Sequence, residues 1–218
     1  MGRRPHKCYR KLNKKAYIKS RFCRSGPESK LALNDLGNKK ASALAFPARI
    51  NLINLEDEHI SSEALEAARI ACNKHLVKNI GKDNFHLRIN KQAITVLRIN
   101  KMMSCAGADR LQAGMRNSFG KPYGRAARVF TGDHVIEIRT KDNFIGHARE
   151  ALRKASNKLP GGQQIQVSQK HGFTGLYREE FQKLHNERLL LARGATVSVI
   201  RPKGPISEFL LKKERALE

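Results

Sequence analysis

The stretch that decides the fold reads SSEALEAARIACNKHLVKNIG over residues 61–81 and continues as KDNFHLRINKQAITVLRIN over residues 82–100. Its first half places small and apolar residues three or four positions apart, which is the spacing of one helix face. Ser61 and Ser62 suit an N-cap, and Gly81 suits the residue that follows a helix. This half therefore predicts a helix over Ser62–Ile80, with Cys72 as a small residue of its core face.

The second half predicts two strands. Phe85–Ile89 and Ile94–Ile99 alternate between apolar and polar residues, as half-buried strands do. Asn90-Lys91-Gln92 lies between them, so we expect the two strands to form a hairpin. Arg88 and Arg98 would then project from the polar sides of this hairpin.

Patterns farther along the chain predict the remaining elements. They are an alternating run over Arg125–Arg139, a helix capped by Asp142 or Asn143 and ended by Pro160, a short strand over Ile165–Val167, a helix over Glu179–Leu191 and a last strand over Thr196–Ile200. Helices and strands alternate without a regular rhythm, which indicates an α+β fold. We expect a mixed or antiparallel sheet packed with two to three helices, plus an extended basic N-terminal arm and a long central loop.

The positive charge is concentrated in two blocks. Among 218 residues, 43 are Lys or Arg and 19 are Asp or Glu, a formal net charge of +24. Residues 1–40 carry +11 and residues 78–128 carry +9, whereas residues 41–77 carry −2. Such blocks favour a polyanionic partner, nucleic acid before an anionic membrane surface. We expect a basic RNA-binding extension over 1–50, a globular domain over 51–205 with a loop over 101–124, and a tail over 206–218.

The N-terminal extension has the composition of an RNA-binding arm. Tyr9, Tyr17 and Phe22 are interleaved with its basic residues, which suits contact with phosphates and stacking on bases. It contains too few apolar residues to fold alone, so we expect RNA to order it. A nuclear-import or solubilising tail is the alternative, although such a tail needs fewer basic residues.

Other classes of protein find less support. Cys8, Cys23, Cys72 and Cys105 include no close pair of the kind zinc sites use, although Cys8, Cys23 and His6 could converge. The basic first residues predict no secretory signal, and no apolar run approaches the roughly 20 residues of a membrane span. We therefore expect a soluble intracellular protein with reduced thiols and no membrane partner.

No catalytic constellation is apparent in the sequence. The Gly-rich segment 101–124 fails the phosphate-binding P-loop pattern, because five residues separate Gly114 from Gly120 and Pro122 follows Lys121. No group of nucleophile, base and orienting residue is recognisable, and no metal or cofactor is expected. The segment instead suits backbone and cation contacts to phosphate, with an inert linker as the alternative.

Seven motifs follow in order along residues 1 to about 205: Met1–Pro5, Ser20–Arg24, Leu36-Gly37 with Lys39-Lys40, Ser61–Arg69, Arg98–Gln112, Gly114–Arg116 and Phe119–Pro122. In these motifs the chain resembles the L sixteen family of large-subunit ribosomal proteins, in the archaeal and eukaryotic branch also called L ten e. Residues 41–56, 141–160 and those after Arg201 depart from the family pattern, so no contact is carried over to them.

The resemblance implies a structural protein of the large subunit near the base of the central protuberance, and not an enzyme. Its loop over residues 102–116 would point toward the peptidyl-transferase centre and the acceptor end of P-site tRNA. The residues expected to bind rRNA are Arg3, Arg4, Lys7, Arg10, Lys14, Arg21, Arg24, Arg88, Lys121, Arg125 and Arg128. Those expected near tRNA are Arg98, Lys101, Met102, Ser104, Cys105, Ala106, Gly107, Ala108, Asp109, Arg110, Gln112 and Arg116.

The resemblance also implies the partners. They are large-subunit rRNA, P-site and A-site tRNA, neighbouring large-subunit proteins, a dedicated assembly chaperone, and the export and anti-association factors released when the protein joins late in the cytoplasm. Three rival classes remain: a free RNA-binding regulator, a basic RNA-modifying enzyme and a membrane-surface protein. The enzyme would need a catalytic or cofactor constellation, and the membrane protein would favour a basic amphipathic helix.

Overall fold

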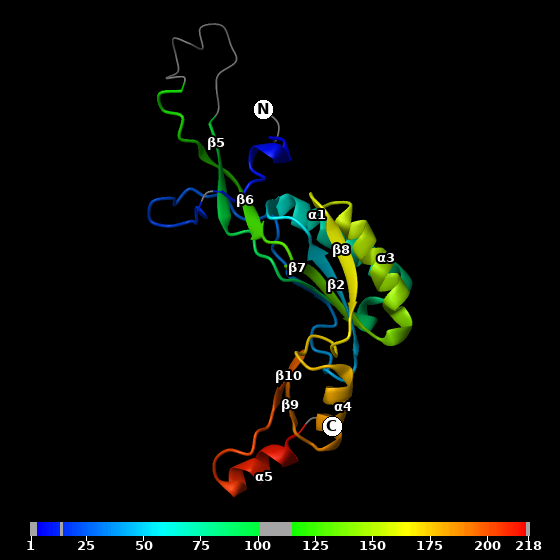
Figure 1. Cartoon of the computed structure of the whole chain (residues 1–218). Helices are drawn as coiled ribbons and strands as arrows, with labels where there is room; N and C mark the ends of the chain where they lie inside the picture. The colour runs from blue at the N-terminus through cyan, green and yellow to red at the C-terminus, as the bar shows by residue number, and fades with distance from the viewer. Residues whose placement is uncertain (1–3, 14, 101–114, 217–218) are drawn as a thin grey trace.

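The computed structural model describes residues 4–13, 15–100 and 115–216, which form an elongated, curved molecule (Figure 1). The strands are β1 (Asp35–Gly37), β2 (Ala48–Asn54), β3 (Glu58–Ser61), β4 (Phe85–Ile89), β5 (Thr95–Ile99), β6 (Lys121–Val129), β7 (His134–Thr140), β8 (Gln163–Ser168), β9 (Leu190–Arg193) and β10 (Thr196–Val199). The helices are α1 (Ser62–Ile80), α3 (Ile145–Ser156), α4 (Arg178–Asn186) and α5 (Ile206–Glu214). Short 3-10 turns occupy His6–Cys8, Lys82–Asn84 and Asp142–Phe144.

The strands form three sheets in which every pair is antiparallel. A five-stranded sheet has the order β1-β4-β7-β2-β8, a three-stranded sheet the order β3-β6-β5, and β9 and β10 form a separate pair. The α+β fold expected from the sequence is therefore confirmed. Among the described residues, no helix is both long and apolar enough to cross a bilayer.

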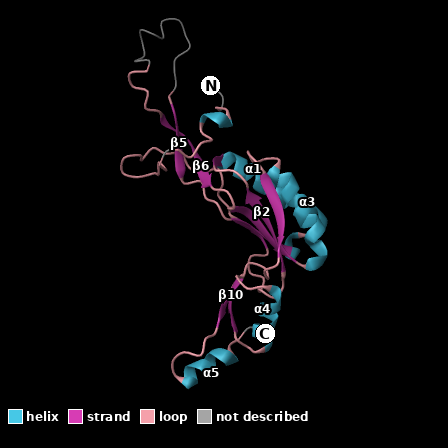
Figure 2. Cartoon of the chain, viewed as in Figure 1, coloured by secondary structure: helices cyan, strands magenta, loops and turns pink. Residues whose placement is uncertain are grey.

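The main core lies between the five-stranded sheet and two helices. α1 and α3 lie side by side along one face of that sheet (Figure 2). Leu65, Leu76 and Leu152 of these helices are fully buried against Ile50 and Ile138 of the sheet. A smaller cluster around Ala43, Phe181 and Leu190 joins α4 to the β9–β10 pair at the other end of the molecule.

The opposite face of the five-stranded sheet is polar and is built around a fully buried arginine. Arg139 donates from Nε to His86 Nδ1 at 2.9 Å and from its terminal nitrogens to the carbonyls of Ala41 and Ser42 at 2.8 and 3.2 Å. Its guanidinium also lies 5.5 Å from the ring centre of Phe173. Arg139 thereby holds the segment before β2 against the sheet, in a role that the sequence did not indicate.

The helix over Ser62–Ile80 is confirmed with the predicted bounds. Ser61 is the N-cap, and its hydroxyl accepts a hydrogen bond from the amide of Ala64 at 3.3 Å. Gly81 follows the helix with a φ of 82°, a conformation that favours glycine. Strong local signals at both ends fix this element independently of its partners.

The predicted hairpin over residues 85–99 is wrong. Both strands exist, but β4 pairs with β1 and β7, whereas β5 pairs with β6 in the other sheet. The amide of Asn90 bonds to the carbonyl of Val135 at 3.0 Å, which extends the pairing with β7. Residues 90–94 thus lead from one sheet to the other.

Other predicted boundaries also change. The run over Arg125–Arg139 is two strands, β6 and β7, separated by a turn in which Gly132 has a φ of 85°. Neither Asp142 nor Asn143 caps α3, because its N-cap is Phe144 without a side-chain bond, and Asp142 pairs with Arg178 at 2.8 Å instead.

The third predicted helix is shorter, because α4 ends at Asn186 and Leu190 begins β9. The division of the chain at residues 50 and 205 stays a prediction. β1 and the start of β2 lie before residue 50, and α5 lies in the expected tail.

A core substitution tests the packing of α1. We expect Leu76→Ala to lower the free energy of unfolding by about 2–5 kcal/mol, because the side chain is fully buried. Ile70→Ala on the same helix is the matched control, since Ile70 is 51% exposed and should cost about 0.5 kcal/mol. Urea unfolding followed by circular dichroism measures both, and equal losses would contradict the assigned helix face.

Candidate nucleic-acid interface

The N-terminal arm, residues 4–27, crosses the three-stranded sheet from one edge to the other. At edge strand β3, the amide of His59 donates to the carbonyl of Arg10 at 2.9 Å. Over the central strand β6, Arg128 donates to the carbonyl of Leu12 at 3.1 Å. At edge strand β5, the amide of Val96 donates to the carbonyl of Tyr17 at 2.7 Å. The arm is thus attached mainly through its own backbone carbonyls.

Attachment through carbonyls leaves the basic side chains of the arm available to a partner. Eight described side chains of the arm are exposed and cationic, and of these Arg10 is paired with Glu56 and Glu58: Arg4, Lys7, Arg10, Lys11, Lys15, Lys19, Arg21 and Arg24. The single acidic residue before Asp35 is Glu28, whose carboxylate lies 3.5 Å from Lys19. The exposed surface of the arm is therefore positive along its length, as a phosphate-binding surface requires.

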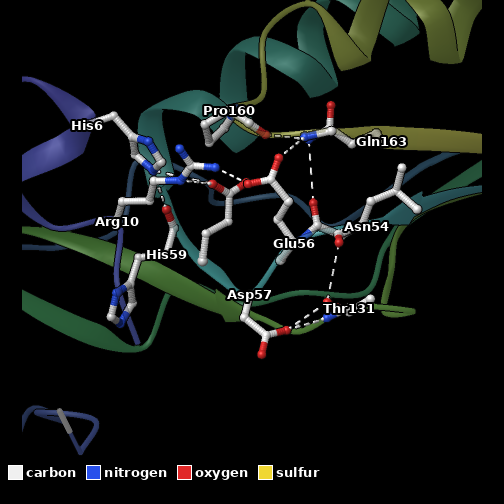
Figure 3. A network of polar contacts seen from close by, with 12 residues as sticks. His6, Arg10, Asn54, Glu56, Asp57, His59, Thr131, Pro160 and Gln163 are labelled. Carbon is white, nitrogen blue, oxygen red and sulfur yellow. Dashed lines mark hydrogen bonds and ion pairs between the residues drawn. The ribbon is translucent and has the colours of Figure 1, made fainter. Parts of the chain in front are cut away.

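A buried carboxylate lies beneath the arm and holds its first residues. The side chain of Glu58 is fully buried, and its Oε2 lies 3.4 Å from Arg10 Nε and 3.9 Å from His6 Nε2. Burial is the largest influence on this carboxyl and raises the pKa of Glu58, which the nearby Arg10 guanidinium, and the His6 ring when it is protonated, partly oppose. Arg10 also pairs with Glu56, and Figure 3 shows Arg10 between His6 and Glu56.

Histidine bonds reinforce this attachment. His6 donates from Nε2 to the carbonyl of His59 at 2.7 Å, and His59 bonds through Nδ1 to the carbonyl of Tyr9 at 2.9 Å. Desolvation is the main cause of a lowered pKa for His59. The neutral ring of His59 therefore carries its proton on Nδ1, because a carbonyl can only accept.

Arg98 joins the arm to the strands that flank the central loop. Its guanidinium lies 4.4 Å from the ring centre of Tyr17 in the arm and 4.3 Å from that of Phe119, just before β6. Both distances suit cation–π attraction. Arg98, which the sequence predicts to project from the polar side of its strand, thus lies between two aromatic rings, and its side chain is partly exposed.

The remaining predicted residues lie in different surroundings. Arg21, Arg24, Arg116 and Lys121 are exposed, with Arg21 over the ring of Phe22. Arg125 donates to the carbonyl of Pro27 at 2.7 Å, so it holds the end of the arm. Arg88 lies on the five-stranded sheet, apart from the arm, where it bonds to Asp35 at 3.0 Å and lies over the ring of Phe173.

Twelve predicted residues lie outside the described part of the chain. They are Arg3 and Lys14 of the arm and Lys101, Met102, Ser104, Cys105, Ala106, Gly107, Ala108, Asp109, Arg110 and Gln112 of the loop. Sequence reasoning missed Glu58, His59 and Thr95, which the arm covers. These residues lie in strands, and no local signal marks a strand residue that another segment will cover.

A basic arm fixed across a small sheet, on an α+β domain, defines a class of protein suited to binding polyanions. The family model described as ribosomal protein L16p/L10e matches residues 12–166. The large ribosomal subunit protein uL16 of Dictyostelium discoideum is 53% identical over 209 residues, covering 96% of each chain. The protein of the same name from Caenorhabditis elegans is 51% identical over 210 residues, covering 96% of this chain and 98% of its own. That of Pinus taeda is 49% identical over 207 residues, covering 95% and 91%.

The chain belongs to the L16p/L10e family of ribosomal proteins, on its eukaryotic side. The family resemblance expected from the sequence is confirmed. The protein is a structural constituent of the large ribosomal subunit and is not an enzyme. Ribosomal RNA and neighbouring ribosomal proteins are therefore its partners.

Removal of one guanidinium tests how the arm is held. We expect Arg10→Gln to loosen the arm, because the buried carboxylate of Glu58 loses its nearest cation. Exchange of the His59 amide hydrogen should become roughly 5- to 30-fold faster, equivalent to about 1–2 kcal/mol. Hydrogen-exchange mass spectrometry of the full chain measures this. Arg4→Gln, which removes the same charge from an exposed side chain, is the control. Equal exchange rates of the His59 amide hydrogen in the two variants would contradict the role of Arg10.

Proposed function

We propose that the protein binds large-subunit rRNA near the base of the central protuberance, through the arm and the three-stranded sheet beneath it. The observation that carries this proposal is the row of exposed cations on an arm whose backbone is already bonded to the sheet. A phosphate backbone would neutralise this row and relieve its mutual repulsion. Because the sheet already orders part of the arm, RNA need supply less of the ordering free energy than for a free tail.

The proposed rRNA-binding residues fall into two groups by their surroundings. Exposed side chains such as Arg4, Arg21, Arg24 and Lys121 are free to reach phosphates, and arginine suits bidentate contact. Arg10, Arg125 and Arg128 bond within the chain and chiefly position the arm. Arg88 would contact rRNA at a separate place on the five-stranded sheet. The other rRNA-binding residues proposed in the arm are Arg3, Lys7 and Lys14.

We further propose that residues 102–116 approach the peptidyl-transferase centre and the acceptor end of tRNA, with P-site and A-site tRNA as neighbours. The pairing of Ile99 with Lys121 supports this, because the segment must leave and re-enter the domain at one place. Arg98, stacked on Tyr17 and Phe119, would fix that place relative to the arm. Arg116 is exposed close by.

Assembly completes the proposal. The protein would join the subunit late, in the cytoplasm, with a dedicated chaperone. Its arrival would promote release of export and anti-association factors. A chaperone is physically reasonable for this chain, because its arm presents a long basic surface that binds RNA non-specifically until it reaches its place.

The salt dependence of RNA binding tests the role of the arm. For the full chain and a large-subunit rRNA fragment, we expect the affinity to fall with salt, with a log–log slope of about 0.7–0.9 per phosphate contact. Arg21→Gln with Arg24→Gln should reduce that slope by about two such contacts. Lys74→Gln with Lys78→Gln, an equal charge change on α1, is the control. Equal slopes for all three proteins would argue against the arm as the binding surface.

Deletion of residues 104–112 tests the role of the loop. We expect the shortened protein to bind rRNA almost as well as the full chain, because the arm and sheet are unchanged. Subunit maturation or translation should nevertheless slow. Sucrose-gradient sedimentation of cells that carry only the shortened protein measures large subunits, ribosomes and polysomes, in low and then high salt. Normal growth with normal polysomes would refute the role of the loop.

A further inference from the structure

A cavity of about 410 Å³ lies between the arm and edge strand β5. This volume falls within the range of about 300–1,000 Å³ that small-molecule sites occupy. Tyr9 and Tyr17 belong to its lining on the arm side, and Thr95 and Val96 to its lining on the sheet.

The charge around this cavity has one sign. Lys7, Lys11 and Lys15 line it at intervals of four residues along the arm, and all three are exposed. Arg98 lines it as well, and none of its lining residues is acidic. A phosphate group placed here would meet several cations and no opposing charge.

Two residues that line this cavity each carry a buried polar atom without a partner in the described part of the chain. His59 is 7% exposed and Thr95 is 5% exposed, and both line the cavity. His59 Nε2 and Thr95 Oγ1 make no hydrogen bond among the described residues. Because Nδ1 of His59 donates to Tyr9, Nε2 presents a lone pair and needs a donor. A buried polar atom without a partner destabilises the fold, so such a pair indicates that a ligand completes it.

We propose that this cavity binds one nucleotide that is extruded from the large-subunit rRNA. The phosphate lies at Lys7, Lys11 and Lys15, and the base lies against a tyrosine ring. A hydroxyl or amino group of the nucleotide donates a hydrogen bond to His59 Nε2, and a polar atom on the edge of the base forms a hydrogen bond with Thr95 Oγ1. Splayed bases stacked on aromatic side chains are the usual route to sequence-specific RNA recognition. This inference rests on the proposed rRNA binding and adds a single recognised position to it.

Two substitutions remove the unpartnered atoms with little change of shape. Thr95→Val replaces the hydroxyl with a methyl group. His59→Asn keeps a donor near the Nδ1 position for Tyr9 and removes Nε2. Thr196→Val in β10 and His147→Asn on α3 make the same chemical changes away from the cavity. Urea unfolding of the four full-length variants shows that the fold is retained, and Thr95→Val is expected to be as stable as the unchanged chain.

The readout is 2′-hydroxyl acylation of rRNA in purified large subunits that carry each variant. We expect one nucleotide to become more reactive in both cavity variants and in neither control. Loss of one hydrogen bond should lower the equilibrium constant for docking of this nucleotide by roughly 2- to 12-fold. Ultraviolet cross-linking of unmodified subunits should join the same nucleotide to a peptide that contains Tyr9 or Tyr17. No such nucleotide, or equal changes in the controls, would overturn the proposal.

A second arm of the experiment separates the sources of the nucleotide. The isolated full chain is titrated with each of the four nucleoside 5′-monophosphates and with a large-subunit rRNA fragment. Saturable binding of a monophosphate that the RNA does not displace would mean a free-nucleotide site and overturn the rRNA assignment. If subunits form normally and the chain binds RNA with normal affinity, but no nucleotide is protected at the cavity, the nucleotide site is refuted and the proposed rRNA binding is not. Absence of RNA binding by the unchanged chain would refute the proposed function as well.

Discussion

The exposed edges of the three-stranded sheet impose the constraint on which the rest of this interface depends. Edge strands present unpaired backbone groups, and proteins commonly cover them with another segment. Here the N-terminal arm covers both, with the carbonyl of Arg10 at β3 and that of Tyr17 at β5. These two bonds fix the path of the arm across the sheet, and this path determines which of its side chains face outward. The cationic surface and the cavity beneath the arm follow from one set of backbone bonds.

The distribution of acids supports the same arrangement. Glu56 and Glu58 lie in and before β3, within the segment of the chain with negative net charge, and both pair with Arg10. A buried carboxylate is costly unless cations compensate it. Glu58 consequently favours an arm that keeps His6 and Arg10 close. Arg10 therefore serves to attach the arm, whereas Arg21 and Arg24 stay exposed and can contact a partner.

The sequence predicts local elements better than it predicts their partners. α1 was predicted with its observed bounds because Ser61 and Gly81 define its ends by local bonds and conformation. Alternation over Phe85–Ile89 and Ile94–Ile99 predicts two strands that match β4 and β5 to within one residue, but it does not predict their pairing. Alternation shows that a strand has two faces, but the pairing with β7 or β6 depends on residues 22–55 positions away. Register across sheets is a property of the whole fold, which no single stretch contains.

The same distinction between local properties and long-range contacts applies to the candidate site. Charge and aromatic content mark the arm as a polyanion-binding segment, because those properties belong to its own residues. The attachment of the arm uses backbone carbonyls, which every residue possesses, so composition cannot reveal it. Arg10 and Arg21 look alike in the sequence, but one pairs with buried Glu58 and the other is exposed over Phe22. A basic residue acts on RNA directly only where the fold leaves its charge unpaired, and the position of an acid 48 residues away decides this for Arg10.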